Sequence, residues 1–511
     1  MYCGNMGRWI SWWSRVDHEK DAVVFEDKRV TYGGLNKNIN RLANALRLRF
    51  DLKSGDRIGC LLTNSIAYYE IAFACAKVGA RLVPFNIRLT GREIGYIAKD
   101  CAPKVVFTED FFLPILESAR EESPDIRLIN LDCDDYQGLL DEANPNPEEP
   151  PNQARWEDDF AILYTSGTTG FPKGAVLTQQ SILAVTHNMM TAFGHSHRDR
   201  FMLQLPLCFT GALIPLSMPI FHAGGTIFLE RDFVPARSLE LIENEKITVS
   251  CGVPTLWKMV SDEAGFADAD FSSMRLVLCG GAPVPVSLLR VYGEKGVPFT
   301  AGYGLTEGGG FNMYLPPERV ATKSGGYIPL LWNDVRAVNG EGQTVQVGEI
   351  GEIIIRGPVL MREYWNHPEA TAETVKDEWL YTGDLARVDE EGYFYIVDRA
   401  KDMIVSGGLN TYPAEVENVI YSFPKVSQAA VIGLPDKVWG EMVAAVVVPK
   451  PGETIGEGEL IEFCRENLAD YKCPKTVILS EALPLNAAGK VLKRQLRQEY
   501  AGHSEHFDVH D

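Results

Sequence analysis

The stretch Tyr164-Thr-Ser-Gly-Thr-Thr-Gly-Phe-Pro-Lys-Gly174 directly follows the apolar run Phe160-Ala-Ile-Leu163, which has the length and composition of a buried strand. Glycine, serine and threonine placed after a strand form a loop whose backbone N–H groups and hydroxyls can surround phosphate oxygens. The loop differs from a Walker P-loop because Pro172, rather than glycine, precedes Lys173. The stretch by itself favours a phosphate-binding loop over a flexible turn.

The sequence before this loop alternates between strand and helix patterns. Short apolar runs bounded by turn residues predict strands at Arg57–Leu62, Arg81–Pro84 and Lys104–Phe107. An amphipathic segment between the first two predicts a helix over Ile66–Val78 that ends at Gly79. Strand, helix and strand at this spacing predict parallel βαβ units, with helices on both faces of a sheet.

The sequence after the loop contains a long uncharged segment, Met202–Leu229, without a single Lys, Arg, Asp or Glu. A segment of this length is long enough to span a bilayer. However, Pro206, Pro215 and Pro219 would break a spanning helix and leave backbone groups unpaired in lipid. We therefore expect a loop, a buried helix and a strand over residues 225–229 that line or support an apolar cavity.

The sequence pattern changes near Asp398. Short apolar segments at 429–432 and 443–448 predict strands, and residues 457–468 have a helical pattern. These elements fit a compact α+β domain of roughly a hundred residues. At 511 residues the chain is too long for one ordinary core, so two or more domains are expected.

Composition and charge exclude several classes of protein. The 45% of hydrophobic and 23% of charged residues are typical of a soluble globular protein. A formal net charge of -20 argues against broad nucleic-acid binding, because no excess of Lys and Arg is present to neutralise phosphates.

Cysteine usage and the N-terminal segment predict a cytoplasmic protein. Ten cysteines are scattered along the chain without a CxxC pair, a pattern typical of reduced thiols. Residues 1–10 lack the basic and apolar regions of a secretory signal. The segment Trp9-Ile10-Ser11-Trp12-Trp13 is read as the packed face of an N-terminal helix, with weak membrane-surface contact as the alternative.

Five further motifs along the chain support a common interpretation with this loop. The loop at 164–174 resembles the signature loop of the adenylate-forming superfamily, which contains acyl-CoA synthetases, luciferases and peptide-synthetase adenylation domains. Gly280-Gly-Ala-Pro283 looks like the adenine-binding turn of that family, and Tyr303-Gly-Leu-Thr-Glu307 looks like its next motif. The resemblance implies that Tyr303 stacks on adenine, that Thr306 touches the α-phosphate and that Glu307 holds Mg2+.

The remaining motifs follow in the family's order. Tyr381-Thr-Gly-Asp384 resembles the ribose-binding motif, in which Asp384 and Arg399 meet the sugar, and Lys401 falls at the family's hinge. Ser406-Gly-Gly408 resembles the loop that lines the pantetheine channel. Pro484-Leu-Asn-Ala-Ala-Gly-Lys490 resembles the segment that carries the adenylation lysine. The resemblance thus covers nearly the whole chain.

The resemblance implies an α/β fold, with a large N-terminal domain of layered α/β sheets and a small α+β C-terminal domain joined by a hinge. The implied bounds are 1–398 for the AMP-binding domain, 399–402 for the hinge and 403–511 for the mobile domain. The implied reaction is activation of a carboxylic acid as an acyl-adenylate, followed by transfer to coenzyme A, with ATP and Mg2+ required.

Each site residue is carried over by its position in a motif. The residues implied in catalysis are Thr165, Glu307 and Lys490, with Glu307 as the metal ligand. The residues implied in ATP binding are Thr165, Ser166, Gly167, Thr168, Thr169, Lys173, Gly281, Ala282, Pro283, Tyr303, Thr306, Asp384, Arg399 and Lys490. The residues implied in CoA binding are Ser406, Gly407 and Gly408.

The acid is the least constrained part of the prediction. The implied acyl pocket contains Phe209, Thr210, Gly308 and Gly309. Relatives usually have Phe-His where this chain has Cys208-Phe209, so the gating role of that histidine is not carried over. Amino-acid-activating relatives place an aspartate where Thr210 stands, which argues against an α-amino acid. We expect an apolar acid, most simply a medium or long fatty acid, and an aryl acid as the next alternative.

Other functions were weighed against this one. One alternative is transfer of the acyl group to a carrier protein. Only seven residues follow Ser504, too few to complete a carrier domain, so such a carrier is expected to be a separate chain. A non-catalytic nucleotide-binding paralogue fits less well, since binding alone does not require Lys490. No nucleic-acid partner is expected, and the sequence leaves the oligomeric state and the pathway open.

Overall fold

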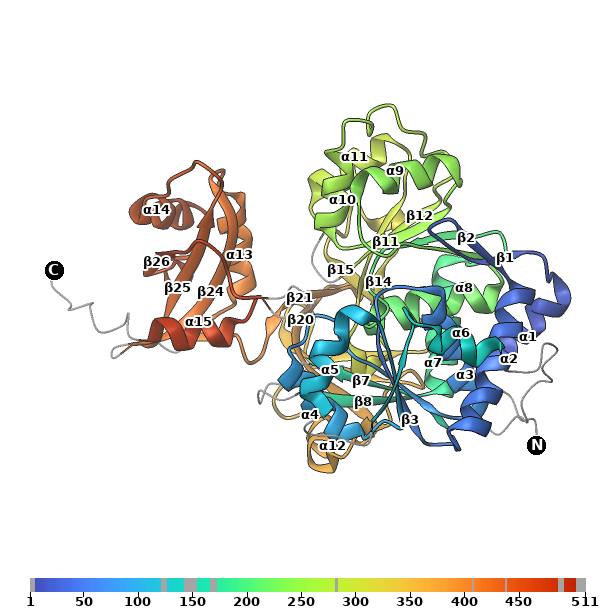
Figure 1. The fold of residues 1–511 in the computed structure, drawn as a ribbon. Helices are drawn as coiled ribbons and strands as arrows, with labels where there is room; N and C mark the ends of the chain where they lie inside the picture. Colours follow the sequence, from blue (N-terminus) through green and yellow to red (C-terminus); the bar gives the residue numbers. More distant parts are fainter. Residues whose placement is uncertain are drawn as a thin grey trace. The chain divides into compact units, whose positions relative to one another are not determined.

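The computed structural model describes residues 5–120, 126–141, 154–165, 172–280, 284–406, 409–436, 439–485 and 491–501. The chain divides into two compact units (Figure 1). The large unit comprises Met1–Val335 and Ile355–Tyr381, and the small unit comprises Arg336–Ile354 and Thr382–Asp511. The predicted α/β class, with a large N-terminal part and a small C-terminal part, is confirmed. The domain boundary at 398 and the hinge at 399–402 stay predictions.

The first sheet of the large unit contains the predicted βαβ units. Its strands lie in the order β18-β8-β7-β4-β3-β5-β6. The bounds are β3 Arg57–Leu61, β4 Arg81–Pro84, β5 Val105–Thr108, β6 Arg127–Asn130, β7 Asp159–Thr165, β8 Lys173–Thr178 and β18 Glu363–Tyr364. Strands β3, β4, β5 and β6 pair in parallel, as predicted, whereas β8 is antiparallel to both β7 and β18.

The helix α3, Ile66–Val78, has the bounds that the sequence predicted. Its first turn is capped by Ser65, whose side chain accepts a hydrogen bond from the N–H of Tyr68. Its last turn ends at Gly79, whose φ of 78° is a left-handed conformation that glycine adopts without strain. Both boundaries are therefore set by local chemistry, which explains why they can be read from the sequence.

A second sheet of the large unit carries the other motifs. Its parallel strands pair in the order β13-β12-β11-β9-β10-β1, and antiparallel strands continue it at both ends. The parallel strands are β1 Asp21–Phe25, β9 Arg200–Leu203, β10 Thr226–Leu229, β11 Val249–Gly252, β12 Leu276–Gly280 and β13 Phe299–Tyr303. The antiparallel strands are β2 Lys28–Thr31, β14 Met313–Leu315 and β15 Gly326–Pro329.

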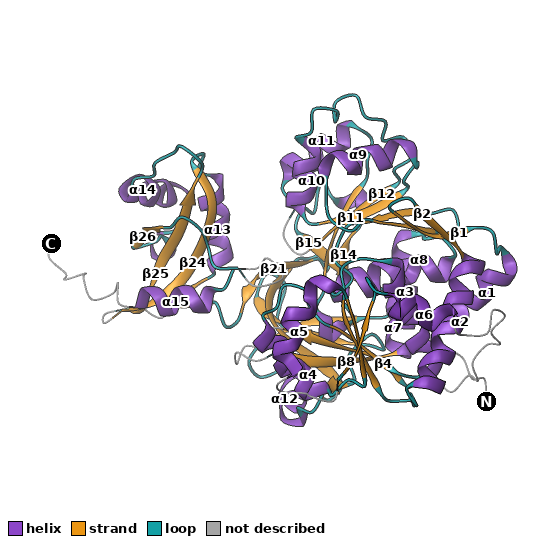
Figure 2. Ribbon diagram, in the orientation of Figure 1, coloured by secondary structure: helices purple, strands orange, loops and turns teal. Residues whose placement is uncertain are grey.

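Helices surround the two sheets (Figure 2). They are α1 Gly7–Val16, α2 Tyr32–Arg49, α4 Gly91–Cys101, α5 Leu113–Arg120, α6 Asp134–Asp141, α7 Gln179–Phe193, α9 Pro235–Asn244, α10 Pro254–Ser261, α11 Val286–Glu294 and α12 Pro368–Thr374. The N-terminal tryptophans belong to α1, where Trp9 is buried and Trp12 is exposed. Packing of this helix is therefore confirmed for Trp9.

The uncharged segment forms the elements that the sequence predicted. A π-helical segment, η2 Ala212–Ser217, is followed by α8 Met218–Ala223 and by strand β10. Most of these side chains are buried, and the hydroxyl of Ser217 donates a hydrogen bond to the carbonyl of Ala212 at 2.7 Å. Among the described residues, none of the helices combines the length and hydrophobicity that crossing a membrane requires.

The small unit has a five-stranded sheet whose core strands are buried on both faces. Its strands are β22 Ile404–Ser406, β23 Leu409–Thr411, β24 Val426–Asp436, β25 Gly440–Pro449 and β26 Thr476–Leu479, with helices α13 Pro413–Ser422, α14 Glu457–Asn467 and α15 Lys493–Tyr500. Along β25, Val443 and Ala445 face one hydrophobic cluster, while Ala444 and Val446 face another. This alternation explains why a central strand reads as a continuous apolar run.

A run of strands precedes this sheet in the sequence, and most of its residues belong to the small unit. Strand β17, Ile350–Arg356, contributes Ile353 and Ile354 to the buried residues. The hairpin of β20, Trp379–Val388, and β21, Phe394–Arg399, pairs Asp384 with Arg399. This hairpin brings together the two side chains that the sequence assigned to the ribose.

Candidate active site

The predicted phosphate loop is held by the β7–β8 hairpin. Its two ends meet in the register that pairs Thr165 with Lys173. Residues 166–171, which include the predicted Ser166, Gly167, Thr168 and Thr169, lie outside the described residues. A tight hairpin brings both ends of the loop to one place, as phosphate binding requires.

Glu307 lies beside the end of this hairpin. It belongs to the short helix η3, Thr306–Gly308, which follows strand β13. The Thr165 hydroxyl donates a hydrogen bond to Glu307 Oε1 at 3.3 Å. Two motifs that are 142 residues apart in the sequence therefore meet at one carboxylate.

The hydroxyl of Tyr364 donates a second hydrogen bond to Glu307 Oε1, at 2.7 Å. The backbone N–H of Met361 also donates to the carbonyl of Glu307 at 2.7 Å. Burial and the neighbouring Glu307 charge raise the pKa of Tyr364 above its ordinary value, so the phenol stays protonated. The sequence analysis missed Tyr364, because no quoted motif contains it and only its strand register places it here.

Glu307 fits a magnesium ion as a single carboxylate ligand. Both hydrogen bonds that the described residues give its side chain fall on Oε1, which leaves Oε2 for a cation. Across the described ranges, no group of three or more His, Cys, Asp or Glu side chains is placed to hold a metal. Mg2+ is commonly bound by one or two carboxylates and by substrate phosphates, so one carboxylate suffices.

Thr306 connects η3 to the uncharged segment. The hydroxyls of Thr306 and Thr210 lie 2.9 Å apart, at hydrogen-bonding distance. Thr210 is buried, and the adjacent Phe209 is half-buried in the turn before η2. The predicted acyl-pocket residues Phe209 and Thr210 thus lie beside the predicted α-phosphate contact.

The glycines after Glu307 are required by close packing. A Cβ on Gly308 would lie 2.4 Å from Asn312 Oδ1, and one on Gly309 would lie 2.5 Å from Val185 Cγ2. Gly309 also has a φ of +79°, which disfavours any side chain. These glycines allow η3 to approach α7 closely, and their predicted role beside the acyl carbonyl stays a prediction.

The predicted adenine contacts lie where β12 and β13 end. Gly280 at the end of β12 pairs with Gly302 of β13, next to Tyr303. The backbone N–H of Asn312 donates to the carbonyl of Tyr303 at 2.8 Å. Gly281, Ala282 and Pro283 lie outside the described residues.

In the small unit, Asp384 and Arg399 form an ion pair. Arg399 Nε lies 3.0 Å from Asp384 Oδ1, and the Asp384 side chain is 9% exposed. Two residues further on, burial lowers the pKa of Lys401, the predicted hinge residue. The carboxylate of this pair can accept two hydrogen bonds, the number that two neighbouring sugar hydroxyls would donate.

The other predicted residues of the small unit are described in part. Ser406 ends β22 and pairs with Leu409 of β23, and Gly407 and Gly408 lie outside the described residues. Lys490 also lies outside them. The described residues on either side of the segment that carries it, Leu485 and Val491, form an isolated β-bridge.

A separate cavity of about 850 Å³ lies away from Glu307. It is bordered by α1 and by the ends of α7 and α8, with Trp9, Trp13 and His222 among its lining residues. None of the predicted site residues that the structure describes lines it.

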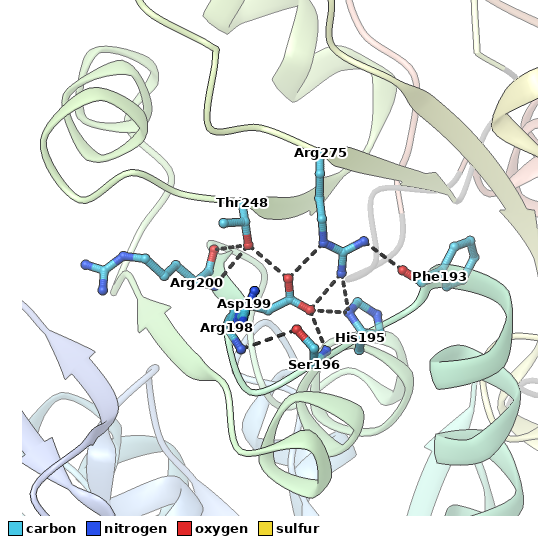
Figure 3. Close-up of polar contacts among 8 residues, drawn as sticks. All are labelled: Phe193, His195, Ser196, Arg198, Asp199, Arg200, Thr248 and Arg275. Carbon is cyan, nitrogen blue, oxygen red and sulfur yellow. Dashed lines mark hydrogen bonds and ion pairs between the residues drawn. The ribbon is translucent and has the colours of Figure 1, made fainter.

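One wall of this cavity is held by a buried polar cluster (Figure 3). Asp199 accepts hydrogen bonds from Arg275 at 2.7 and 2.8 Å and from Thr248 at 3.1 Å, and it lies 3.4 Å from His195. Burial opposes its charge, but the bonds with His195 and Arg275 prevail and keep the pKa of Asp199 below its ordinary value. The cluster ties the end of α7 to strands β9, β11 and β12.

Comparison with known proteins gives matches along almost the whole chain. The family model for AMP-binding enzymes matches residues 10–365, and the model for the AMP-binding enzyme C-terminal domain matches residues 415–490. A feruloyl-CoA synthase of Amycolatopsis sp is 39% identical over 97% of this chain and 99% of its own length. A long-chain-fatty-acid–CoA ligase of Mycobacterium tuberculosis, FadD13, is 37% identical over 93% of this chain and 94% of its own.

Solved structures of similar enzymes also match the fold of this chain over almost its whole length. A Mycobacterium tuberculosis fatty acyl CoA synthetase superposes with a TM-score of 0.80 at 35% identity, covering 98% of this chain and 99% of that one. The o-succinylbenzoate CoA synthetase of Bacillus subtilis in complex with its acyl-adenylate superposes with a TM-score of 0.87 at 31% identity, covering 96% and 97%.

Proposed function

The chain belongs to the AMP-binding enzyme family, and from this premise we propose that it activates an apolar carboxylic acid and transfers the acyl group to coenzyme A. It is an AMP-forming acid–thiol ligase that uses ATP, Mg2+ and coenzyme A. The observation that carries the proposal is the contact between Thr165 and Glu307, because it joins the phosphate loop to the metal-ligand motif. We take these two residues, with Lys173 and Thr306, as the nucleotide site of the large unit.

The first half-reaction makes the acid reactive. A carboxylate resists attack because an oxide would have to leave, so its oxygen must first become part of a phosphate leaving group. The carboxylate oxygen attacks the α-phosphorus of ATP, the bond from that phosphorus to the bridging oxygen breaks, and pyrophosphate leaves. The protein forms no covalent bond in this step, so its task is positioning and charge stabilisation.

Three residues of the nucleotide site, and one lysine of the small unit, have proposed roles in that step. Glu307 would hold Mg2+, which when bound would supply positive charge to the phosphate oxygens. Lys173 at the end of the loop adds a second positive charge, and the Thr306 hydroxyl donates to the α-phosphate. Lys490 of the small unit neutralises the charge that develops where the carboxylate oxygen meets the α-phosphate.

The second half-reaction forms the thioester. The sulfur of coenzyme A attacks the acyl carbonyl and loses its proton, and the bond from that carbon to the AMP oxygen breaks. Ser406, Gly407 and Gly408 are proposed to line the path of the pantetheine arm. The two half-reactions need different faces of the small unit, so we propose that this unit turns about Lys401 between them.

The proposed acid has an uncharged, apolar body. The segment 202–229, which contains Thr210, has no acidic side chain that would meet an α-amine. A medium or long fatty acid is the first candidate, and the identity of 37% to a long-chain-fatty-acid–CoA ligase supports it.

An aryl acid is the second candidate. The identity of 39% to a feruloyl-CoA synthase over 97% of the chain supports it at least equally. A further relative, 36% identical, carries the name of a fatty acid–[acyl-carrier-protein] ligase, which keeps transfer to a carrier protein as the third alternative.

A single assay separates these candidates. Pyrophosphate release is measured with ATP and Mg2+ over a panel of fatty, aryl and amino acids, with and without coenzyme A. The proposed function predicts release with apolar acids and turnover only when coenzyme A is present. Release that coenzyme A does not accelerate, but that an acyl carrier protein does, favours the carrier alternative. No release and no retained adenylate with any acid overturns the proposal.

A further inference from the structure

Tyr364 is placed at the nucleotide site by strand pairing. It is the second residue of β18, and it pairs with Ala175 of β8, two residues after Lys173. The backbone N–H of the next residue, Trp365, donates a hydrogen bond to the carbonyl of Gly174 at 2.7 Å. The position of Tyr364 is therefore coupled to the strand that leaves the phosphate loop.

The hydroxyl and the ring of Tyr364 contact opposite charges. The hydroxyl donates to Glu307 Oε1 at 2.7 Å, and Lys173 Nζ lies 5.4 Å from the centroid of the ring. In the described part of the chain, no ion pair joins Lys173 directly to Glu307. A lysine and a glutamate that paired would neutralise each other, and neither would then be available to a metal–phosphate complex.

The backbone around Tyr364 reinforces the arrangement. Met361 donates its N–H to the carbonyl of Glu307 at 2.7 Å, so the segment 361–364 holds both the backbone and the side chain of that residue. The N–H of Tyr364 donates to the Thr371 hydroxyl at 2.9 Å. Hydrogen bonds thus hold both the backbone and the hydroxyl of Tyr364.

We propose that Tyr364 is a positioning residue for the magnesium nucleotide: its hydroxyl aims Glu307 Oε2 at the metal, and its ring keeps Lys173 apart from that carboxylate. This assignment rests on the proposed function, because it gives Glu307 to Mg2+ and Lys173 to the phosphates. A two-residue strand, far from both motifs in the sequence, then sets the geometry of the metal site.

The test compares Y364F with the native protein. The phenylalanine keeps the ring and removes only the hydrogen bond to Glu307. We expect the half-saturating Mg2+ concentration for pyrophosphate release to rise about tenfold, as is typical for loss of a hydrogen bond to a charged group. High Mg2+ should restore most of the rate, since the ligand itself is still present.

A binding measurement avoids the reaction altogether. Free Mn2+ is followed by electron paramagnetic resonance in the presence of α,β-methylene-ATP, which cannot lose pyrophosphate. The dissociation constant for Mn2+ should rise about tenfold in Y364F. In Y364L, which also removes the ring, the dissociation constant for the nucleotide analogue should rise as well, because Lys173 is no longer held.

A matched control is Y395F. Tyr395 is half-buried and donates to an Asp389 carboxylate oxygen at 3.2 Å, but it lies in the β20–β21 hairpin of the small unit. It should leave the Mg2+ and Mn2+ dependences unchanged. The melting temperatures of Y364F and Y395F report any general loss of stability.

The outcomes separate the two proposals. Native protein that releases no pyrophosphate with any acid overturns the proposed function. Native protein that does release it, together with Y364F that keeps native Mg2+ and Mn2+ dependences, overturns only the role of Tyr364. A lower melting temperature of Y364F with native metal binding has the same meaning, since the hydroxyl then serves stability alone.

Discussion

His222 illustrates at the residue scale how burial sets the charge of one side chain. Its ring packs edge-on against Trp9, with 4.9 Å between centroids, and lies 5.5 Å from His187. Burial, aided by His187, lowers the pKa of His222 to about 4. The imidazole is therefore neutral at pH 7, as its apolar neighbours require.

The lowered pKa predicts acid sensitivity. In the unfolded chain this histidine takes up a proton near pH 6.5, whereas in the folded chain it does so only near pH 4. The stability that its neutral form contributes is present above pH 6.5 and is lost as the pH falls toward 4. After allowance for partial exposure, we expect a loss of roughly 2 kcal/mol over this window.

The measurement is the free energy of urea unfolding between pH 7 and pH 4. H222Q should show a shallower decline than the native protein, while H18Q, which changes an exposed histidine, should not. Equal declines in the native protein and H222Q would mean that other groups carry the acid sensitivity.

At the same scale, the two charged residues of the proposed nucleotide site, Glu307 and Lys173, are each contacted by neutral groups. Glu307 accepts two hydroxyl hydrogen bonds on one oxygen, and Lys173 is held by an aromatic ring. In the described part of the chain each charge contacts neutral groups rather than the other charge, so neither is neutralised by an ion pair. This division keeps both charges available for a ligand.

At the scale of elements, the attachment of α1 depends on the end of α8. Gly224 ends α8 with a φ of 77°, and the indole of Trp13 packs against it. The indole Nε1 donates to the carbonyl of His222 at 3.0 Å. Gln179 at the start of α7 adds a second attachment, because its side chain accepts from Met6 N and donates to the Ala76 carbonyl.

G224A should therefore destabilise the large unit. An alanine here would adopt a strained left-handed conformation, and its Cβ would lie 2.3 Å from a ring atom of Trp13. We expect a loss of about 2–4 kcal/mol in unfolding free energy, from about 1 kcal/mol of backbone strain and the remainder from overpacking.

G194A is the matched control for this prediction. Gly194 also ends a helix, with a φ of 61°, but a Cβ there would meet no atom within 4 Å. It should lose only the backbone contribution of about 1 kcal/mol in a urea titration. Equal losses of unfolding free energy in G224A and G194A would show that overpacking against Trp13 contributes nothing to the destabilisation.

At the scale of the whole molecule, two units with separate cores are expected to share one reaction. The proposed nucleotide contacts belong to the large unit, and the proposed ribose residues and Lys490 belong to the small unit. Because the proposed residues belong to separate units, a substitution in the small unit is expected to slow one half-reaction and spare the other. Lys490 is the residue by which this can be tested.

K490M should abolish the first half-reaction and spare the second. Without the lysine, the charge between carboxylate and α-phosphate is unbalanced, and pyrophosphate release should fall by about a hundredfold or more. Thioester formation from a supplied acyl-adenylate should remain within about threefold of native, since the lysine is proposed to be withdrawn at that stage.

The control for this variant is K475M, which changes a partly exposed lysine of the small unit whose nearest carboxylate lies 3.9 Å away. It should leave both half-reactions at native rates. An equal loss of both half-reactions in K490M would contradict a role limited to adenylation.

The sequence by itself determined the elements whose signals are local. Helix α3 is bounded by Ser65 and Gly79, and β25 is a continuous apolar run, because capping and two-sided burial act on neighbouring residues. The motifs around Thr165, Glu307 and Asp384 were likewise visible, since each is a short run of adjacent residues. Their family was recognisable without coordinates for the same reason.

Only the tertiary structure decided which distant residues meet. Tyr364 reaches Glu307 because a two-residue strand pairs with β8, and Trp13 reaches Gly224 because α1 packs on α8. Contacts of this kind depend on strand order, register and helix packing, which residues far apart in the chain settle together. No local pattern records them, so the hydrogen-bond partner of the proposed metal ligand Glu307 became visible only in the folded chain.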